Sequence, residues 1–307
     1  MILCDLSQVI SACIVVGDCL SCAQTPSEQS KGMIKHSVIN SIRANYMLHK
    51  DQYGKMILAC DQGSWRYDVF PQYKHARKEK RKTDTSGINW DFVSECKSEL
   101  YSDLDKYFPY PIIKLPRTEG DDVIGVLAKL INDSPSLMEE DIFGNIEKEQ
   151  ILVVSSDRDN YQLMQLGRHV KQYAPMMKKL VKPDIPSRHS LIEKIVKGDV
   201  GDGIPSIKSI DDQLVQKIRQ KPISQKYLQT FFDSKNPIDC CLTDEERVNY
   251  IRNEQLVSYE KIPSDIQEGI ISCYNTQMAK VHAKMELLNY FTRNKMPNLY
   301  SQISDFY

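Results

Sequence analysis

The chain has 307 residues, 41% of them hydrophobic and 26% charged, which is typical of a soluble globular protein with one large core or two smaller ones. Its 40 basic and 41 acidic side chains give a formal net charge of −1. This nearly neutral charge excludes attraction of a nucleic acid by the protein as a whole, so a nucleic-acid partner would have to be bound by a local basic patch. No apolar run approaches the roughly 20 residues of a membrane span, and the N-terminus lacks a basic leader, so we expect a cytoplasmic protein without membrane attachment.

Nine cysteines, an odd number at irregular spacing, favour reduced intracellular thiols over a disulfide framework. Cys19 and Cys22 form one CxxC pair. A structural zinc ion would need two further ligands, which Cys240 with Cys241 or His36 supply only if the fold brings them close. Buried or incidental thiols are therefore our interpretation.

The first two predicted strands each end in an aspartate. Residues 2–7 form a short apolar strand that carries Asp5, and residues 56–61 form another that ends in Asp61. One such aspartate also fits a turn or a helix cap. Two strands that end alike favour a shared site, because ligands in open α/β sheets gather at the carboxyl ends of the strands. Apolar residues at near-helical spacing predict a helix over 33–48 between them.

A basic and aromatic tract covers residues 65–84. It contains seven basic, three acidic and four aromatic side chains: Arg66, Lys74, Arg77, Lys78, Lys80, Arg81 and Lys82; Asp68, Glu79 and Asp84; Trp65, Tyr67, Phe70 and Tyr73. This mixture suits phosphate neutralisation and base stacking, although the 78–82 portion alone also fits a solvated loop. The spacing of Tyr73, Lys74 and Arg77 predicts one face of a short helix beside the acidic site.

Three acids crowd the start of a later helix. Residues 88–104 predict a helix, and 109–116 contain a short strand between prolines. A helix over 123–131 follows, with Thr118 as its predicted N-cap. Its start carries Glu119, Asp121 and Asp122. A cap and the helix macrodipole explain one or two acids there, but three repel one another unless cations compensate.

Two further pairs of acids follow. After a predicted loop at 133–149, the stretch 151–163 opens with a buried apolar strand and delivers Asp157 and Asp159 into a loop. A strand near 169–173 comes next.

Residues 187–197 predict a helix that ends in a glycine-rich turn bearing Asp199 and Asp202. The glycines fit a helix C-cap, but the helix dipole disfavours anions at that end. Beyond residue 206 the sequence predicts mostly amphipathic helices with a basic surface. These include helices at 244–256, with Thr243 as the N-cap, at 266–283 and at 284–294.

The acids at element ends have no histidine or cysteine beside them at ligand spacing. They are Asp5, Asp61, Glu119, Asp121, Asp122, Asp157, Asp159, Asp199 and Asp202. A site made only of carboxylates selects hard cations, Mg²⁺ or Mn²⁺, over zinc. Beside a basic tract, such a site suits metal-assisted phosphodiester chemistry, in which two ions about 4 Å apart generate the nucleophile and stabilise the leaving oxygen.

Six motifs in this order give a resemblance to a known family. They are CDLS at 4–7, CDQGSWR at 60–66, YKHAR at 73–77, EGDD at 119–122, SSDRDNYQL at 155–163 and KGDVGDGIP at 197–205. The chain resembles the 5′ nuclease superfamily of flap endonucleases and 5′ to 3′ exonucleases, and within it the ribonuclease H of T-even-like bacteriophages. Residues 253–275 also look like that phage branch, so the resemblance covers nearly the whole chain.

The resemblance implies an α/β fold with a central, mainly parallel sheet flanked by helices. The nuclease core would span 1–185, including a basic arch at 66–90 under which a single-stranded 5′ end passes. A helical C-terminal region at 186–307 would contain a helix-three-turn-helix at about 190–220 that grips duplex phosphates. The family's glycine-rich hairpin after that motif's first helix is replaced here by KSIDDQL.

The resemblance also implies roles for individual residues, and it leaves Asp122 outside the metal set. The first, catalytic metal would be surrounded by Asp5, Asp61, Glu119, Asp121 and Asp157, and the second by Asp159, Asp199 and Asp202. Lys74 and Arg77 would steer the scissile phosphate. Nucleic acid would be bound by Arg66, Tyr73, Lys74, Arg77, Lys78 and Lys208.

The implied activity is that of a metal-dependent 5′ to 3′ exonuclease and flap endonuclease with two Mg²⁺ ions, for which Mn²⁺ substitutes. Its substrates would be RNA primers in RNA–DNA hybrids and DNA with 5′ flaps or 5′ overhangs, during lagging-strand replication. We expect a monomer and a single-stranded-DNA-binding protein as partner of the C-terminal region. Two alternatives stay open: a replication factor that binds branched DNA without cutting it, and a PIN-type ribonuclease.

Overall fold

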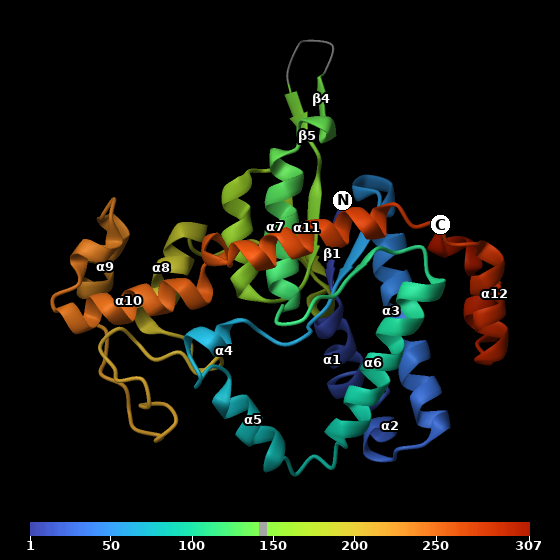
Figure 1. Cartoon of the computed structure of the whole chain (residues 1–307), viewed down its shortest axis with the longest axis horizontal. Coiled ribbons are helices and arrows are strands. Elements are labelled where there is room, and N and C mark those ends of the chain that lie inside the picture. Colours follow the sequence, from blue (N-terminus) through green and yellow to red (C-terminus); the bar gives the residue numbers. More distant parts are fainter. Residues whose placement is uncertain (141–145) are drawn as a thin grey trace.

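The computed structural model describes residues 1–140 and 146–307, and its centre is a six-stranded sheet (Figure 1). The strands are β1 Ile2–Asp5, β2 Met56–Ala59, β3 Ile112–Ile113, β6 Ile151–Val154, β7 Val170–Ala174 and β8 Lys179–Leu180. Their order is β3-β2-β1-β6-β7-β8, with β8 antiparallel to β7 and the other neighbours parallel. The predicted α/β fold with a mainly parallel sheet is confirmed.

Strand β1 lies at the point where the winding of the sheet reverses. The chain runs outward from β1 to β2 and β3, then returns to the other side of β1 as β6. Ile2 therefore pairs with Met56 on one side and with Leu152 on the other. In open α/β sheets this switch point is where the loops after neighbouring strands part and a ligand can enter.

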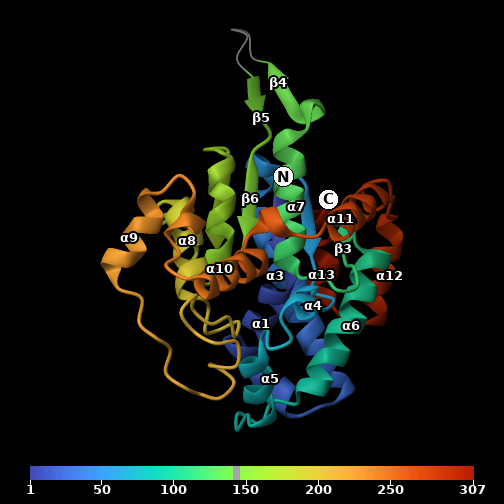
Figure 2. The ribbon, with the colours of Figure 1, turned by 60° about the vertical axis from the view of Figure 1, so that its left-hand side comes forward.

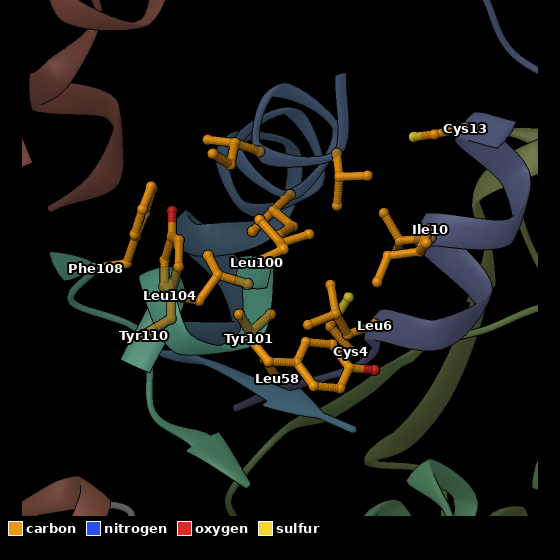
Figure 3. Packing of buried hydrophobic residues seen from close by; sticks show 14 of the residues in the cluster. Cys4, Leu6, Ile10, Cys13, Leu58, Leu100, Tyr101, Leu104, Phe108 and Tyr110 are labelled. Atoms are coloured by element: carbon orange, nitrogen blue, oxygen red, sulfur yellow. The ribbon is translucent and has the colours of Figure 1, made fainter. Parts of the chain in front are cut away.

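One face of the sheet is covered by helices from both ends of the chain. They are α1 Leu6–Val15, α2 Leu20–Gln24, α3 Glu28–Tyr53, α6 Trp90–Tyr107, α12 Lys284–Arg293 and α13 Pro297–Ser301. Figure 3 shows side chains of this layer, among them Leu6 and Ile10 of α1 and Leu100 and Leu104 of α6, which belong to one buried cluster. The ring of Phe108 packs edge-on against three rings of the C-terminal elements, Tyr290, Phe291 and Phe306. The C-terminal helices are thus part of the main core.

The opposite face is covered by α7 Gly120–Asp133 and α11 Ser264–Met278, which cross each other in front of the sheet (Figure 1). Helix α7 begins at the carboxyl edge of the sheet, next to the end of β1. Its N-cap is Glu119, so the prediction of Thr118 was wrong by one residue. The side chain of Asp122 accepts a hydrogen bond from the Glu119 amide at 3.0 Å, and this contact fixes the start of the helix.

A third apolar cluster joins the basic tract to the C-terminal region. It contains α4 Arg66–Val69, α8 Ser187–Lys197, α9 Gln225–Asp233 and α10 Asp244–Val257. Figure 2 shows α8, α9 and α10 together at one side of the sheet. Helix α8 has the predicted bounds, and α10 begins after Thr243, whose side chain accepts from the Glu246 amide as predicted.

The helix-three-turn-helix predicted at about 190–220 is present only in its first helix. After α8 the chain forms turns, and the next helix is α9. The carbonyls of this segment are bound by side chains in place of helical amides. Asn253 donates to Pro205, and Asn249 donates to Ile207 and Ser209. The region beyond residue 206 is mostly helical as predicted, but helices begin only at α9, because polar contacts from α10 satisfy the backbone of a looped segment before it.

Two other predictions need correction. Part of the loop predicted at 133–149 is an antiparallel ribbon of β4 Met138–Glu140 and β5 Ile146–Lys148, preceded by a short helix η1 Pro135–Leu137; residues 141–145 of that loop lie outside the described residues. Helix α5 is His75–Lys82, so Tyr73 and Lys74 precede it and share no helix face with Arg77.

The remaining short helices are η2 Arg158–Leu166, η3 Pro175–Met177, η4 Pro237–Cys240, η5 Tyr259–Lys261 and η6 Ile303–Phe306. All nine cysteines are free thiols, and Cys19 and Cys22 are buried in the layer of α1 and α3. Across 1–140 and 146–307, no helix combines the length and the apolar character needed to cross a membrane. The domain boundary expected at 185/186 stays a prediction.

Replacing Phe108 with alanine should lower the free energy of unfolding by about 3–5 kcal/mol, because a fully buried ring packed against three others would be lost. Urea denaturation measures this change. The matched control is Tyr300→Ala at a ring that is 47% exposed, which should change stability by less than about 0.5 kcal/mol. Equal losses in the two variants would contradict the described packing of the C-terminal helices.

Candidate active site

Four aspartates from four segments lie at the switch point of the sheet. Asp5 ends β1, Asp61 follows β2, Asp121 is in the first turn of α7, and Asp157 follows β6. The amide of Gly120 donates to Asp61 Oδ1 at 2.7 Å. A Cβ atom on Gly120 would stand 3.2 Å from Asp61 Oδ1 and 3.6 Å from Asp5 Oδ1. Glycine at this position therefore lets α7 approach both carboxylates closely. We call Asp5, Asp61, Asp121 and Asp157 the inner acids.

The inner acids lie close enough to repel one another: Asp5 is buried, Asp121 and Asp157 are half-buried, and the side chain of Asp61 is 42% exposed. Burial, followed by the charges of Asp61 and Asp157, raises the pKa of Asp5 to about 7. Burial also raises the pKa of Asp121 well above its usual value, and the charges of Asp5 and Asp157 add to the shift. Lys97 of α6 is 3.9 Å from Asp61. In the described part of the chain, no ion pair joins Asp5, Asp121 or Asp157 to a basic side chain.

The other four predicted metal ligands each contact a cation of the chain. We call them the outer acids: Glu119, Asp159, Asp199 and Asp202. Lys74 pairs with Glu119, and Arg77 lies 2.5 Å from Asp202. Lys194 pairs with both Asp159 and Asp199. The two groups of acids thus differ in their charge partners. Every outer acid has a basic partner, whereas among the inner acids only Asp61 has one, Lys97.

Tyr73 and Arg66 support the outer acids from within the protein. The Tyr73 hydroxyl, on a residue only 3% exposed, is 3.0 Å from Glu119 and 3.2 Å from Asp202. Arg66 is 4% exposed, donates to Asp122 at 2.8 Å and to Glu119 at 2.9 Å, and lies over the ring of Trp65. Both polar groups are buried and already hydrogen-bonded, and the binding of nucleic acid by Tyr73 and Arg66 stays a prediction.

Asp122 is fully buried against Arg66 and belongs to the start of α7. Its exclusion from the predicted metal set agrees with this contact. A buried arginine with two carboxylate partners neutralises charge that would otherwise add to the repulsion among the inner acids.

Several supporting residues were not predicted. Gln172 of β7 donates to the carbonyls of Ser155 and Asp157 at 2.8 and 2.7 Å and so holds the loop after β6. Asn160 donates to Asp121 at 3.4 Å. Lys97 and Lys194 were also missed. Asn160 lies inside the SSDRDNYQL motif and could have been found there, whereas Gln172, Lys97 and Lys194 have no local signal.

The other predicted nucleic-acid contacts have different degrees of exposure. Lys78 is exposed on α5 with its ammonium 4.0 Å from the centre of the Tyr67 ring. Arg77 is partly exposed, and its Nε donates to the carbonyl of Gly201 at 3.1 Å. Lys208 lies over the ring of Tyr227, 3.9 Å from Glu246. Binding of nucleic acid by these three residues and by Lys74 stays a prediction.

The carboxylates suit a hard divalent cation in donor type and in charge. All donors are oxygens, and the inner acids lie close enough to raise the pKa values of Asp5 and Asp121, so an added cation would relieve their repulsion. Among residues 1–140 and 146–307, however, no three His, Cys, Asp or Glu side chains are gathered as ligands around one point. The fit therefore rests on the oxygen donors and on the repulsion among the inner acids, and the metal assignments stay predictions.

Two family models match the chain. Residues 21–194 match the 5′-3′ exonuclease N-terminal resolvase-like domain, and residues 187–306 match the C-terminal domain of T4 RNase H. The chain belongs to the 5′-3′ exonuclease family. The resemblance inferred from the sequence motifs is confirmed, and it places the protein among the nucleases.

Relatives and solved structures agree with this membership. Ribonuclease H of Enterobacteria phage T4 is 28% identical over 282 residues, which cover 89% of this chain and 87% of the relative. Flap endonuclease Xni of Shewanella pealeana is 27% identical over 195 residues, covering 61% and 66%. The chain is similar in fold to the T5 D15 protein co-crystallised with metal ions (TM-score 0.58, 16% identity, 91% and 99% covered). It is also similar to bacteriophage T5 flap endonuclease in complex with DNA and metal ions (TM-score 0.60, 13% identity, 91% and 99% covered).

Asp121→Asn should stabilise the metal-free protein at pH 8 and leave its stability unchanged near pH 4. Because the folded-state pKa of Asp121 is raised, ionisation above the unfolded-state pKa costs folding free energy, which asparagine avoids. One pKa unit corresponds to about 1.4 kcal/mol. A gain of this size outweighs the roughly 0.3–1 kcal/mol of stability that is lost when the favourable negative charge at the helix N-terminus is removed. Melting in EDTA should show a Tm gain of a few degrees at pH 8.

The matched control is Asp18→Asn at an exposed aspartate, which should leave Tm unchanged at both pH values. A lower Tm for Asp121→Asn at pH 8 would contradict the description of the inner acids as a repelling group.

Proposed function

We propose that this protein is a divalent-metal-dependent 5′ nuclease that acts as a 5′ to 3′ exonuclease and flap endonuclease. Its substrates are RNA primers in RNA–DNA hybrids and DNA with 5′ flaps or overhangs, which it removes during lagging-strand replication in the cytoplasm. The observation that carries the proposal is the group of four mutually repelling aspartates at the switch point, in a chain that belongs to the 5′-3′ exonuclease family.

The ligands proposed for the first ion are the inner acids with Glu119. The ligands proposed for the second are Asp159, Asp199 and Asp202. Bound Mg²⁺, or Mn²⁺ in its place, would supply a hydroxide nucleophile at neutral pH and a positive charge opposite the leaving oxygen. Gln172 and Asn160 support this arrangement, since they fix the loop of Asp157 and contact Asp121.

Lys74 and Arg77 are the cations proposed to orient the scissile phosphate. The amide of Lys74 donates to the carbonyl of Asp202 at 2.7 Å, so the backbone of the basic tract is fastened to the loop of the outer acids. The Lys74 ammonium contacts Glu119, and the Arg77 guanidinium contacts Asp202. Positive charge fixed at the edge of an acidic site would draw a phosphate toward the inner acids and counter charge that develops in the transition state.

Helix α5 supports the proposed contact with a single-stranded 5′ end. It carries Lys78, Lys80, Arg81 and Lys82, all exposed. In Figure 1 the chain runs out from α4 along α5 and returns along α6. The connection between α5 and α6 is anchored on α2, where Gln24 donates to the carbonyl of Ser86 at 2.7 Å. A basic helix held at both ends beside the acids suits a strand whose phosphates need neutralising.

The C-terminal region is proposed to hold the duplex and a protein partner. Helix α8 and the looped segment after it present Lys208, and backbone amides there add further phosphate contacts. A single-stranded-DNA-binding protein is the proposed partner of the C-terminal helices. We propose that the protein acts as a monomer.

The two alternatives predict different behaviour. A factor that only binds branched DNA gains nothing from crowded acids that repel one another. A PIN-type ribonuclease would prefer unstructured RNA, whereas this chain has 120 residues that match the T4 RNase H C-terminal domain. Cleavage assays with a 5′ flap, an RNA-primed duplex and a single-stranded RNA separate all three functions.

Asp157→Asn should reduce Mg²⁺-dependent cleavage of a 5′-labelled flap by at least about 10³-fold, because an inner acid is lost. Binding of the same DNA in Ca²⁺ or EDTA should stay within about twofold, since the basic residues are unchanged. Product mapping and an electrophoretic binding assay measure the two quantities. Cleavage by the variant at the wild-type rate would overturn the proposed function.

Lys74→Met should lower the single-turnover cleavage rate by about 10²-fold, because its ammonium is close to Glu119 and to the proposed phosphate position. Lys78→Met, on the exposed face of α5, is the matched control and should mainly weaken binding and reduce its salt dependence. If both variants change only binding, Lys74 has no role in the chemical step.

A further inference from the structure

Lys194 lies between two of the outer acids. It comes from the last turn of α8, and its ammonium contacts Asp159 and also Asp199 at 2.7 Å. The three side chains are between 20% and 24% exposed, so solvent screens them only in part. Lys194 is the chain's own cation at the point where carboxylates from η2 and from the loop after α8 meet.

This bridge differs from the other contacts of the outer acids. Lys74 and Arg77 each pair with one outer acid, whereas Lys194 joins two acids that belong to different segments. Without a cation between them, Asp159 and Asp199 would repel each other. Asp199 is further fixed by the amide of Asp202, which donates to it at 3.1 Å. The ammonium therefore occupies the position that a second cation would need.

We propose that Lys194 is the resident counterion of the outer acids, and that a divalent cation binds between Asp159 and Asp199 only by displacing its ammonium. This inference rests on the proposed function, because it concerns the second ion. A divalent cation carries twice the charge and accepts more oxygen ligands than an ammonium group, so it can replace it between two carboxylates.

The surroundings leave room for the displaced side chain. An open cavity of about 590 Å³ borders Lys194 and is lined by Ser156, Arg158, Ser190 and Lys197, among others. The flexible four-carbon stem of lysine can move the ammonium into this space without moving the helix. The second ion then binds more weakly than the first. Its apparent affinity is the intrinsic affinity multiplied by the fraction of molecules in which the Lys194 ammonium has already left.

Lysine labelling of the wild-type protein tests the displacement directly. The probe is a small acetylating reagent, applied with and without Mg²⁺ and read out by mass spectrometry. Mg²⁺ should increase the labelling of Lys194 by at least roughly fivefold, since its ammonium leaves the ion pair. Lys197 is the internal control: it pairs with Glu193 at 2.6 Å, one turn away on the same helix, and should be labelled equally in both conditions. Unchanged or lower labelling of Lys194 would overturn the inference.

A pair of variants tests the competition. Lys194→Met should tighten the weaker Mn²⁺-binding step, measured by calorimetry without DNA, by at least roughly fivefold, and Lys197→Met should leave it unchanged. Unchanged or weaker Mn²⁺ binding by Lys194→Met would overturn the inference. If Lys194→Met does not fold, the labelling experiment still decides, because it uses the wild-type chain.

The inference and the proposed function fail in different ways. A wild-type protein that cleaves a flap while Lys194 stays protected in Mg²⁺ overturns the role of Lys194 and leaves the nuclease assignment intact. Wild-type protein that does not cleave any 5′-ended substrate overturns the function, whatever the labelling of Lys194.

Discussion

The structure depends on one electrostatic constraint: four aspartates, of which Asp5 is buried and the others are partly exposed, lie together where the sheet reverses its winding. The ends of β1, β2 and β6 and the start of α7 all point to this place, so the topology that builds the sheet also concentrates the negative charge. Burial and mutual repulsion raise the pKa values of Asp5 and Asp121. Such a site costs folding free energy, which the surrounding core must supply and which a bound cation would return.

The chain compensates this charge in layers. Arg66 neutralises Asp122 and Glu119 within the core, while Lys74, Arg77 and Lys194 pair with the outer acids. These cations come from the basic tract and from α8, which are far apart in sequence and joined by a common apolar cluster. The same contacts therefore hold the basic tract, the sheet and the C-terminal region together, and they place positive charge where a phosphate would enter.

Much of this arrangement could be predicted from the sequence, because it depends on local patterns. Short apolar runs that end in Asp5, Asp61 or Asp157 indicate strand ends, and helix α8 and the cap at Thr243 follow local rules. The burial of Arg66 and Tyr73 could not be predicted, since it depends on carboxylates more than 40 residues away. The loop after residue 206 was missed for a similar reason, as side chains of α10 satisfy its carbonyls. The residues around Lys194 in the sequence do not distinguish it from any other surface lysine of a helix.

The most direct test of the central claim is anomalous scattering from a crystal soaked in Mn²⁺, with an Asp121→Asn crystal as the control. A strong peak is expected among Asp5, Asp61, Asp121 and Asp157 in the wild-type protein, at higher occupancy than any peak beside Asp159 and Asp199, and this peak should weaken or disappear in the variant. Absence of a peak among the inner acids, or a peak that the variant retains at full strength, would contradict the central claim.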